Sequence, residues 1–200
     1  MHRGHYARSL LEMNKIKMAT RGFTLIELMV TLALVVILMA MAAPSFTSFQ
    51  RNSELTSFAN NMIASINAAR GEAMKRGRRA MIVPTDGLNW NSGWVVFVDI
   101  NFDATYNSAS DVTIVTAAPP PSYLTVSGNG SAAPGTPYIM FDASGFPKLT
   151  SGGFGALTFN IERNDDTSAE QKRRIIISSA GRVRTCKPST DPTCGLISTQ

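Results

Sequence analysis

A long uncharged segment near the N-terminus constrains the fold of this chain more than any other feature. Residues 28–50 contain no Asp, Glu, Lys or Arg, and a single acid, Glu27, stands at the start of this apolar run. A charged side chain deep in a membrane costs about 2.5–3.5 kcal/mol on insertion scales. Glu27 therefore needs a cationic partner, or else it faces the lipid headgroups as part of a plain signal anchor.

The residues on either side of Glu27 predict a membrane anchor with a defined orientation. Residues 23–43 are long and apolar enough to cross a bilayer as one helix. Residues 1–22 carry five cations and one acid, so they hold +4 of the net charge of +5. The positive-inside rule leaves this basic leader in the cytoplasm and directs everything after the helix outward.

The helix is predicted to continue beyond the membrane segment with an amphipathic pattern. Pro44 predicts a kink or a local opening, and Gly77 between two arginines predicts the end of the helix. Apolar residues recur at spacings of three and four, and this stripe consists of Leu55, Phe58, Met62, Ile66, Ala69 and Ala73. We therefore expect one long helix over residues 23–76.

From residue 79 onward the pattern changes to short β-branched segments separated by turn signals. Strands are expected near residues 80–83, 94–99, 112–116, 123–126, 138–141, 157–162 and 174–179. No helical pattern interrupts them, so the sheet should be largely antiparallel. The predicted fold class is α+β, with a long N-terminal helix packed on a largely antiparallel β-sheet domain.

The two cysteines, Cys186 and Cys194, lie close together near the C-terminus. In a reducing compartment they would be free thiols, whereas in an exported domain a disulfide is the default. Their spacing is not that of a zinc knuckle or a redox motif. We expect a disulfide that closes a short loop, which is worth about 2–3 kcal/mol by chain entropy.

A basic cluster next to these cysteines is the clearest candidate binding site. Residues 171–190 contain no acid, and the cations of the cluster are Lys172, Arg173, Arg174, Arg182, Arg184 and Lys187. Gly181 lets the chain turn, and Arg182 and Arg184 would point to the same side of an extended segment and clamp a phosphate. The alternative is that both arginines pair with Asp165, Asp166 or Glu170 as ordinary surface charges.

A second basic group lies at the predicted end of the helix. It consists of Arg70, Lys75, Arg76, Arg78 and Arg79, offset by Glu72. Cations near a helix C-terminus interact favourably with its dipole. We favour this capping role over a second patch for nucleic acid.

Residues 99–103, with Asp99 and Asp103 as its acids, resemble the first half of a calcium loop. Ala104 stands where an EF-hand has its glycine and Ser110 where it has its bidentate glutamate. A turn rich in Asp and Asn after a strand is the favoured interpretation.

The sequence offers no set of residues for catalysis or for holding a cofactor. Both histidines, His2 and His5, lie in the leader, so a chain without residues 1–22 has no imidazole. Its serines and threonines then lack a histidine base, and no glycine-rich loop ends in Gly-Lys-Ser/Thr. We expect no enzymatic activity, no catalytic residue, no metal site and no cofactor.

Residues 22–28, which read GFTLIEL, resemble the N-terminal signature of type IV pilins and pseudopilins. The resemblance implies that a prepilin peptidase cuts after Gly22 and methylates the new amino group on Phe23. It also implies that Glu27 pairs with the Phe23 amine of a neighbouring subunit during filament assembly, since two buried opposite charges offset each other's desolvation. The leader is long for this family, and Met13 or Met18 could be the true start in place of Met1.

Three further segments resemble the GspH/FimT branch of pilin-like proteins: RGEA at residues 70–73, GWVVFVDIN at 93–101 and SAGRVR at 179–184. The resemblance implies a cleaved leader (1–22), a membrane and assembly half of the helix (23–44), an amphipathic half (45–78) and a periplasmic β-rich domain (79–200). It implies a single-pass protein of the bacterial inner membrane that joins a pilus with other major and minor pilins.

The GRVR segment at residues 181–184 matches the GRxR pattern of FimT-type minor pilins that bind DNA for natural transformation. The resemblance implies non-specific binding to the backbone of double-stranded DNA. Four phosphate contacts would give a slope of about −3 to −4 in a plot of log K against log salt concentration. The alternatives are a minor pseudopilin of a type II secretion system and a structural priming pilin that serves assembly and twitching.

Overall fold

The computed structural model describes residues 22–195. The predicted leader and the alternative starts at Met13 and Met18 lie outside these residues. By its internal contacts the chain divides into two compact units, residues 1–45 and residues 46–200.

One helix, α1 (Leu25–Arg76), belongs to both units. Thr24 caps its start, because the Thr24 hydroxyl accepts a hydrogen bond from the Glu27 N–H at 3.3 Å. Its end is a Schellman turn in which Gly77 has a φ of 62° and the Arg78 N–H donates to the Ala73 carbonyl. The predicted end is confirmed and the start lies two residues later than predicted. α1 is continuous past residue 44, and the kink there stays a prediction.

In the first unit, α1 presents apolar side chains all around its surface. Its leucines, valines, isoleucines and methionines between residues 25 and 41 are all exposed. The stretch is long enough and free enough of charge to cross a membrane. A helix that is apolar on every side is stable only where lipid or other protein covers it.

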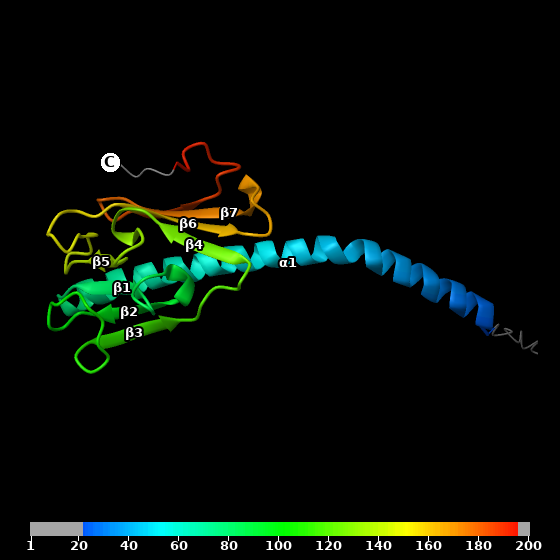
Figure 1. The fold of residues 1–200 in the computed structure, drawn as a ribbon, viewed down its shortest axis with the longest axis horizontal. Coiled ribbons are helices and arrows are strands. Elements are labelled where there is room, and N and C mark those ends of the chain that lie inside the picture. The colour runs from blue at the N-terminus through cyan, green and yellow to red at the C-terminus, as the bar shows by residue number, and fades with distance from the viewer. Residues whose placement is uncertain (1–21, 196–200) are drawn as a thin grey trace, which may run out of the picture. The chain divides into compact units, whose positions relative to one another are not determined.

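Between residues 46 and 195, the described part of the second unit contains eight strands and three short 3-10 helices besides α1. In chain order these elements are β1 (Ala80–Pro84), η1 (Trp90–Ser92), β2 (Trp94–Val98), β3 (Val112–Ala117), β4 (Leu124–Gly128), η2 (Gly130–Ala132), β5 (Ile139–Phe141), β6 (Leu157–Arg163), η3 (Ala169–Gln171), β7 (Lys172–Ile177) and β8 (Val183–Cys186). They form two four-stranded sheets, β3-β2-β1-β5 and β4-β6-β7-β8, in which every named pair is antiparallel. Figure 1 shows both sheets alongside the second half of α1.

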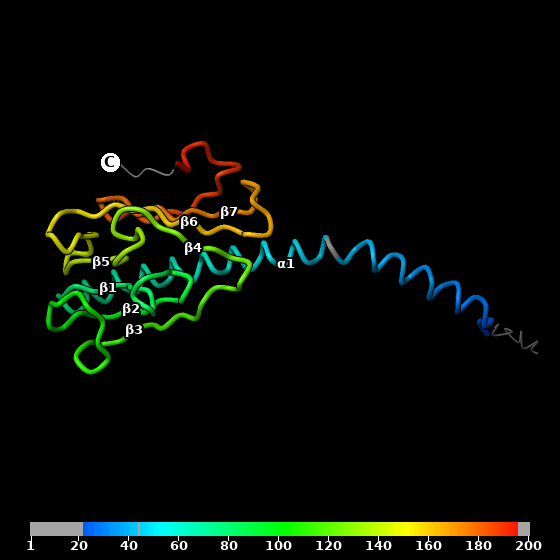
Figure 2. The backbone as a smooth tube through the Cα atoms, in the orientation of Figure 1, coloured from blue at the N-terminus to red at the C-terminus, as the bar shows by residue number. Residues whose placement is uncertain are grey.

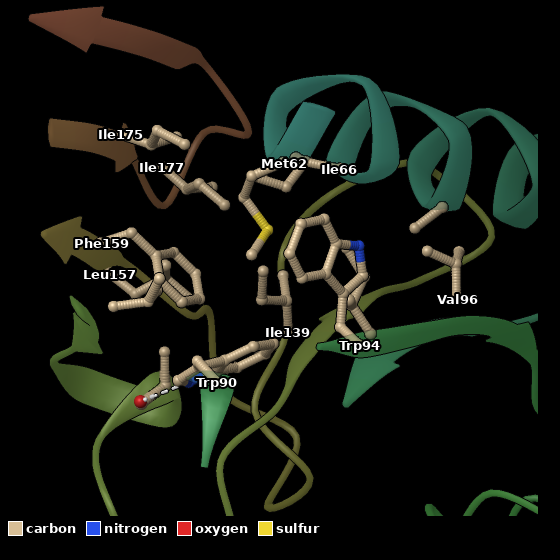
Figure 3. Packing of buried hydrophobic residues seen from close by; sticks show 14 of the residues in the cluster. Met62, Ile66, Trp90, Trp94, Val96, Ile139, Leu157, Phe159, Ile175 and Ile177 are labelled. Atoms are coloured by element: carbon tan, nitrogen blue, oxygen red, sulfur yellow. Dashed lines mark hydrogen bonds between the residues drawn. The ribbon is translucent and has the colours of Figure 1, made fainter. Parts of the chain in front are cut away.

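The core lies between this half of α1 and both sheets. All six residues of the predicted apolar stripe are buried, from Leu55 to Ala73, as the helical spacing requires. Figure 3 shows Met62 and Ile66 of α1 pointing at Trp94 of β2, Ile139 of β5 and Phe159 of β6. The two buried indoles have hydrogen-bond partners, because Trp94 Nε1 donates to Ser65 Oγ at 2.9 Å and Trp90 Nε1 to the Ala132 carbonyl at 3.0 Å.

The structure corrects the prediction in two places. The strands form two sheets, where the sequence pattern suggested one. The last strand, β8 (Val183–Cys186), was not predicted, because it is short and its polar sequence carries no β-branched run. β8 pairs with β7 so that Arg184 lies opposite Ile176, and this places the GRVR segment at the edge of the second sheet.

Candidate nucleic-acid interface

The GRVR segment begins in a tight turn between β7 and β8. The Gly181 N–H donates to the Ser178 carbonyl at 2.8 Å, and the Ser178 N–H donates to the Arg182 carbonyl at 3.0 Å. Gly181 has a φ of 80°, a left-handed conformation that side chains disfavour. A Cβ at Gly181 would also lie 3.1 Å from the Gly145 carbonyl oxygen. Both the backbone angle and the close packing therefore require glycine.

Arg70 of α1 holds this turn in place through a hydrogen bond to its backbone. Its Nη1 donates to the Gly181 carbonyl at 2.8 Å, across 111 residues of sequence. Arg70 was predicted to cap the helix dipole, and the structure gives it this tertiary role. Lys75 and Arg76 do lie in the last turn of α1, where both pair with Glu72.

Arg182 differs from the other cations of the basic cluster. Arg182 is exposed, and within residues 22–195 its side chain has neither a hydrogen bond nor an ion pair. Only its backbone N–H is bonded, to Ser178 Oγ. The guanidinium is therefore available for a phosphate.

Arg184 is bound within the C-terminal tail. Its Nη1 lies 3.3 Å from Asp191 Oδ2 and 3.1 Å from Thr193 Oγ1, and its Nη2 donates to the Thr193 carbonyl at 2.6 Å. The hydroxyl and backbone N–H of Thr193 donate to Asp191 and, together with Arg184, hold the pKa of that carboxyl below its usual value. The alternative to a phosphate clamp, an ion pair of each arginine, holds for Arg184 but with another acid, since Asp191 takes the place of Asp165, Asp166 or Glu170. Asp191 lies one residue beyond the acid-free window.

The tail is closed by the predicted disulfide between Cys186 and Cys194, both buried. Within the loop, the N–H groups of Thr190 and Asp191 donate to the Lys187 carbonyl. The loop carbonyl of Cys194 accepts a hydrogen bond from Arg174 Nη1. The closed loop thus binds Arg174 of β7 and Arg184 of β8 to itself.

The remaining cations of the cluster also have partners. Lys172 lies 2.9 Å from Glu162, and Lys187 forms an ion pair with Glu170. Arg173 lies on the core side of β7, where its Nη2 donates to Asn52 Oδ1 of α1 at 2.9 Å. Burial lowers the pKa of Arg173 from its usual value, although an arginine remains charged at neutral pH. The seven predicted residues lie along the hairpin of β7 and β8 and the loop after it but do not form one cluster, because Lys172 and Arg173 begin β7 whereas Gly181 and Arg182 lie at the turn beyond its end. Among these cations, only Arg182 has an unpaired side chain in the described part of the chain.

The loop after β2 is organised by two aspartates that bind backbone N–H groups. Asp99 accepts from Phe102 at 2.7 Å and Ala104 at 2.8 Å, and its Oδ2 also accepts from Arg79 Nε at 2.7 Å. Asp111 likewise accepts from two backbone N–H groups of this loop. These oxygens face donors, and no group of three His, Cys, Asp or Glu that could hold a metal ion occurs within residues 22–195. The turn interpretation is the one that fits.

Comparison with known proteins identifies the family. Residues 59–181 match the family model described as type II transport protein GspH. The match spans more than half of the chain. This chain belongs to the GspH family. Residues 17–43 additionally match the prokaryotic N-terminal methylation motif, so the GspH domain follows a pilin-type N-terminus.

Solved structures agree with this GspH assignment at the level of the fold. The type IV minor pilin FimU of Pseudomonas aeruginosa has a TM-score of 0.53 at 22% identity, covering 73% of this chain and 98% of FimU. The minor pseudopilin EpsH from the type II secretion system of Vibrio cholerae has a TM-score of 0.51 at 11% identity, covering 68% of this chain and 98% of EpsH. The search of curated proteins gives no match. The chain is a GspH/FimT-like protein of the pilin and pseudopilin class, with the pilin fold.

The predicted processing residues lie where α1 begins. Gly22 and Phe23 precede the helix in open surroundings, since a Cβ at Gly22 would meet no atom within 4 Å. Glu27 lies in the first turn with its residue exposed. The positions of these residues fit the proposed roles in cleavage, methylation and assembly, which stay predictions.

Sequence reasoning missed two residues that shape the interface. Asp191 neutralises Arg184, and a loop carrying an acid and a threonine between two cysteines was the available signal. Arg70 supports the Gly181 turn, and no local signal could reveal a contact across 111 residues.

Proposed function

We propose that this GspH-family chain is a minor type IV pilin that binds extracellular double-stranded DNA without sequence readout, for uptake in natural transformation. The observation that carries the proposal is the exposed Arg182 side chain on a glycine turn held by Arg70. The fixed turn holds the backbone that carries Arg182 in place, and a guanidinium is suited to phosphate. No catalytic role is proposed.

The N-terminal half of α1 supports the pilin part of the proposal. A prepilin peptidase would cut after Gly22 and methylate Phe23, within the matched methylation motif. The apolar half of α1 would hold the precursor in the inner membrane, with the β-rich domain in the periplasm, and would then pack among other pilins. Glu27 would pair with the Phe23 amine of a neighbouring subunit, because a carboxylate surrounded by apolar helices needs a cation.

The internal contacts of the basic cluster set the expected strength of DNA binding. With Arg182 available and Arg184 exchangeable, one or two phosphates would be neutralised. The slope of log K against log salt concentration should then be about −1 to −2, well below the value for four contacts. Binding by one subunit should be weak, and several copies would be needed for firm capture.

A minor pseudopilin of a type II secretion system is the second candidate. The family description and the tail geometry favour it, because Arg184 is already bound to Asp191 and Thr193 and so serves the tail itself. In that case the tail would contact another protein. A structural priming pilin would use the same surface for another minor pilin.

The test compares two cations that differ in their surroundings. Arg182→Ala should lower the affinity of the full-length protein for duplex DNA and make the salt slope shallower by about 0.9. Lys75→Ala, which removes an equal charge already paired with Glu72, should change little. Unchanged duplex affinity in the charge-reversed variant Arg182→Glu would reject DNA binding and favour the pseudopilin. Normal piliation with lost transformability in Arg182→Glu would reject the priming role.

A further inference from the structure

Two exposed aromatic rings stand in the loop between β5 and β6. Phe146 is 39% exposed and Phe154 is 58% exposed. Their ring centroids lie 5.9 Å apart with the planes at 86°. Lys148 Nζ lies 3.6 Å from the Phe154 centroid. Aromatic rings and a cation thus share one small surface.

The loop that carries these rings is held in shape by its own hydrogen bonds. The Phe146 N–H donates to Asp142 Oδ1, and the Asp142 N–H donates to the Phe146 carbonyl, both at 3.0 Å. Lys148 and Phe154 are bridged as in an antiparallel pair. A rigid loop that exposes two phenyl rings has a surface prepared for a ligand, since their exposure does not come from a loose chain.

This surface adjoins the Gly181 turn. A Cβ at Gly181 would lie 3.1 Å from the Gly145 carbonyl oxygen and 3.4 Å from Pro147 Cδ. The residues on both sides of Phe146 therefore touch the residue before Arg182. In Figure 2 the yellow β5–β6 loop and the orange turn after β7 lie at the same end of the domain. No local sequence pattern indicates this contact, because 36 positions separate Phe146 from Arg182.

We propose that Phe146, Phe154, Lys148 and Arg182 form a binding site for single-stranded nucleic acid. Unpaired bases stack on exposed aromatic rings, whereas the bases of a duplex keep their faces covered. Lys148 and Arg182 supply cations for the adjacent phosphates, and Asp142 at 3.8 Å offsets only Lys148. The inference rests on the proposed DNA binding and adds strands with unpaired bases to the ligands of the same surface.

The charge of the site favours a polyanion over a protein partner. Arg182 has no ion pair in the described chain, and the Lys148–Asp142 contact is long, at 3.8 Å, with side chains 23% and 32% exposed. Surface pairs of this kind are worth about 0–1 kcal/mol and exchange readily. A phosphate backbone can take both cations while a base covers the Phe154 ring.

The experiment measures binding of the full-length protein in neutral detergent to a short oligothymidine and to a hairpin duplex of equal phosphate number. Phe154→Ala should lower the oligothymidine affinity about 5- to 100-fold and leave the duplex affinity unchanged. Phe154→Trp should retain binding, and its fluorescence should fall when a base stacks on it. Phe102→Ala removes another exposed ring, in the loop after β2, and should change neither affinity.

The outcomes separate this inference from the proposed function. Arg182→Ala should lower the affinity of the protein for both the oligothymidine and the duplex. If Arg182→Ala lowers both affinities and Phe154→Ala lowers neither of them, the stacking site is rejected and the proposed DNA binding stands. If Phe154→Ala weakens duplex and single strand equally, stacking on unpaired bases is rejected. If the wild-type protein binds neither ligand, DNA binding itself fails, and the exposed rings would then belong to a protein contact.

Discussion

Two arginine–aspartate pairs in the second unit have the same chemistry in different surroundings. Arg163–Asp165 lies where β6 meets α1, with side chains 4% and 28% exposed, whereas Arg184–Asp191 lies in the tail at 31% and 32%. Arg163 also donates to Ser48 of α1 and to Gln171, so it joins three parts of the domain. The Arg163–Asp165 pair therefore stabilises the fold, whereas Arg184 of the second pair is accessible to an anionic ligand.

The difference shows that the number of cations in a sequence says little about its binding surface. Asp165 accepts from both Arg163 and Arg51, and the Arg163 guanidinium keeps the pKa of that carboxyl well below its usual range. A guanidinium buried this deeply cannot reach a ligand. In the tail, the Arg184–Asp191 pair is about one-third exposed and can exchange one anion for another at small cost. The following variants test whether burial makes this distinction.

Asp165→Asn should have the largest effect. It leaves Arg163 buried without its carboxylate, and breaking such a pair costs about 3–5 kcal/mol. Denaturant unfolding of the full-length protein should show a loss at the lower end of that range, because Ser48 and Gln171 still accept from Arg163. Asp166→Asn is the control, since no ion pair of Asp166 occurs in the described residues. Equal losses in both variants would contradict the special role of Asp165.

The same pair predicts an acid-dependent stability. The folded-state pKa of Asp165 lies below that of an unfolded aspartate, about 3.9. The stabilisation is therefore fully present above that unfolded value and is lost as the pH falls through the folded-state pKa. The stability difference between wild type and Asp165→Asn should be constant above about pH 5 and shrink below about pH 4. A difference that stays constant into strong acid would show that the carboxylate charge is not the cause.

Removing the disulfide should have the next effect. Cys186→Ser with Cys194→Ser opens a loop with a sequence separation of 8, for which chain entropy gives about 2–3 kcal/mol. The unfolding midpoint of the wild-type protein should fall in reductant to that of the double variant, and reductant should leave the midpoint of the double variant unchanged. A chain that ends before the loop lacks both the disulfide and the loop's contacts. If it loses the same unfolding free energy as the double variant, the disulfide alone stabilises the fold. If it loses more, the loop's contacts with Arg174 and Arg184 contribute as well.

The sequence predicted the fold well because its strongest signals are periodic and local. The apolar stripe from Leu55 to Ala73 placed the core face of α1, and Gly77 placed its end. The seven predicted strands all overlap observed ones. The split into two sheets depends on which strands pair at long range, and β8 has four residues, which are too few to show a strand pattern. Both features depend on tertiary packing, and the hydrophobic periodicity of a sequence contains no information about it.

The candidate site was predicted in composition but not in geometry. Six cations without an acid looked like an open clamp, yet Asp191 and Thr193 bind Arg184, and Arg173 turns to the core side of β7. Strand alternation explains the second point, because Arg173 shares the face of the buried Ile175 and Ile177. The contact between Gly181 and the β5–β6 loop was beyond any sequence window.

Asp191→Asn should have the smallest effect on stability and the most telling effect on binding. The pair is about one-third exposed, so the loss should be under about 1 kcal/mol, and an asparagine oxygen can still accept from Thr193 as Asp191 does. Arg184 would then keep only its contacts with the uncharged Thr193. A phosphate would meet no competing carboxylate there, so duplex affinity should rise and the salt slope steepen by about 0.9. Adding Arg184→Ala should abolish both changes. Asp166→Asn removes an equal charge without releasing a described arginine, so it should raise the affinity less and leave the slope alone. If the two aspartate variants behave alike, general charge governs binding, and the contrast between the buried and the exchangeable pair carries no functional meaning.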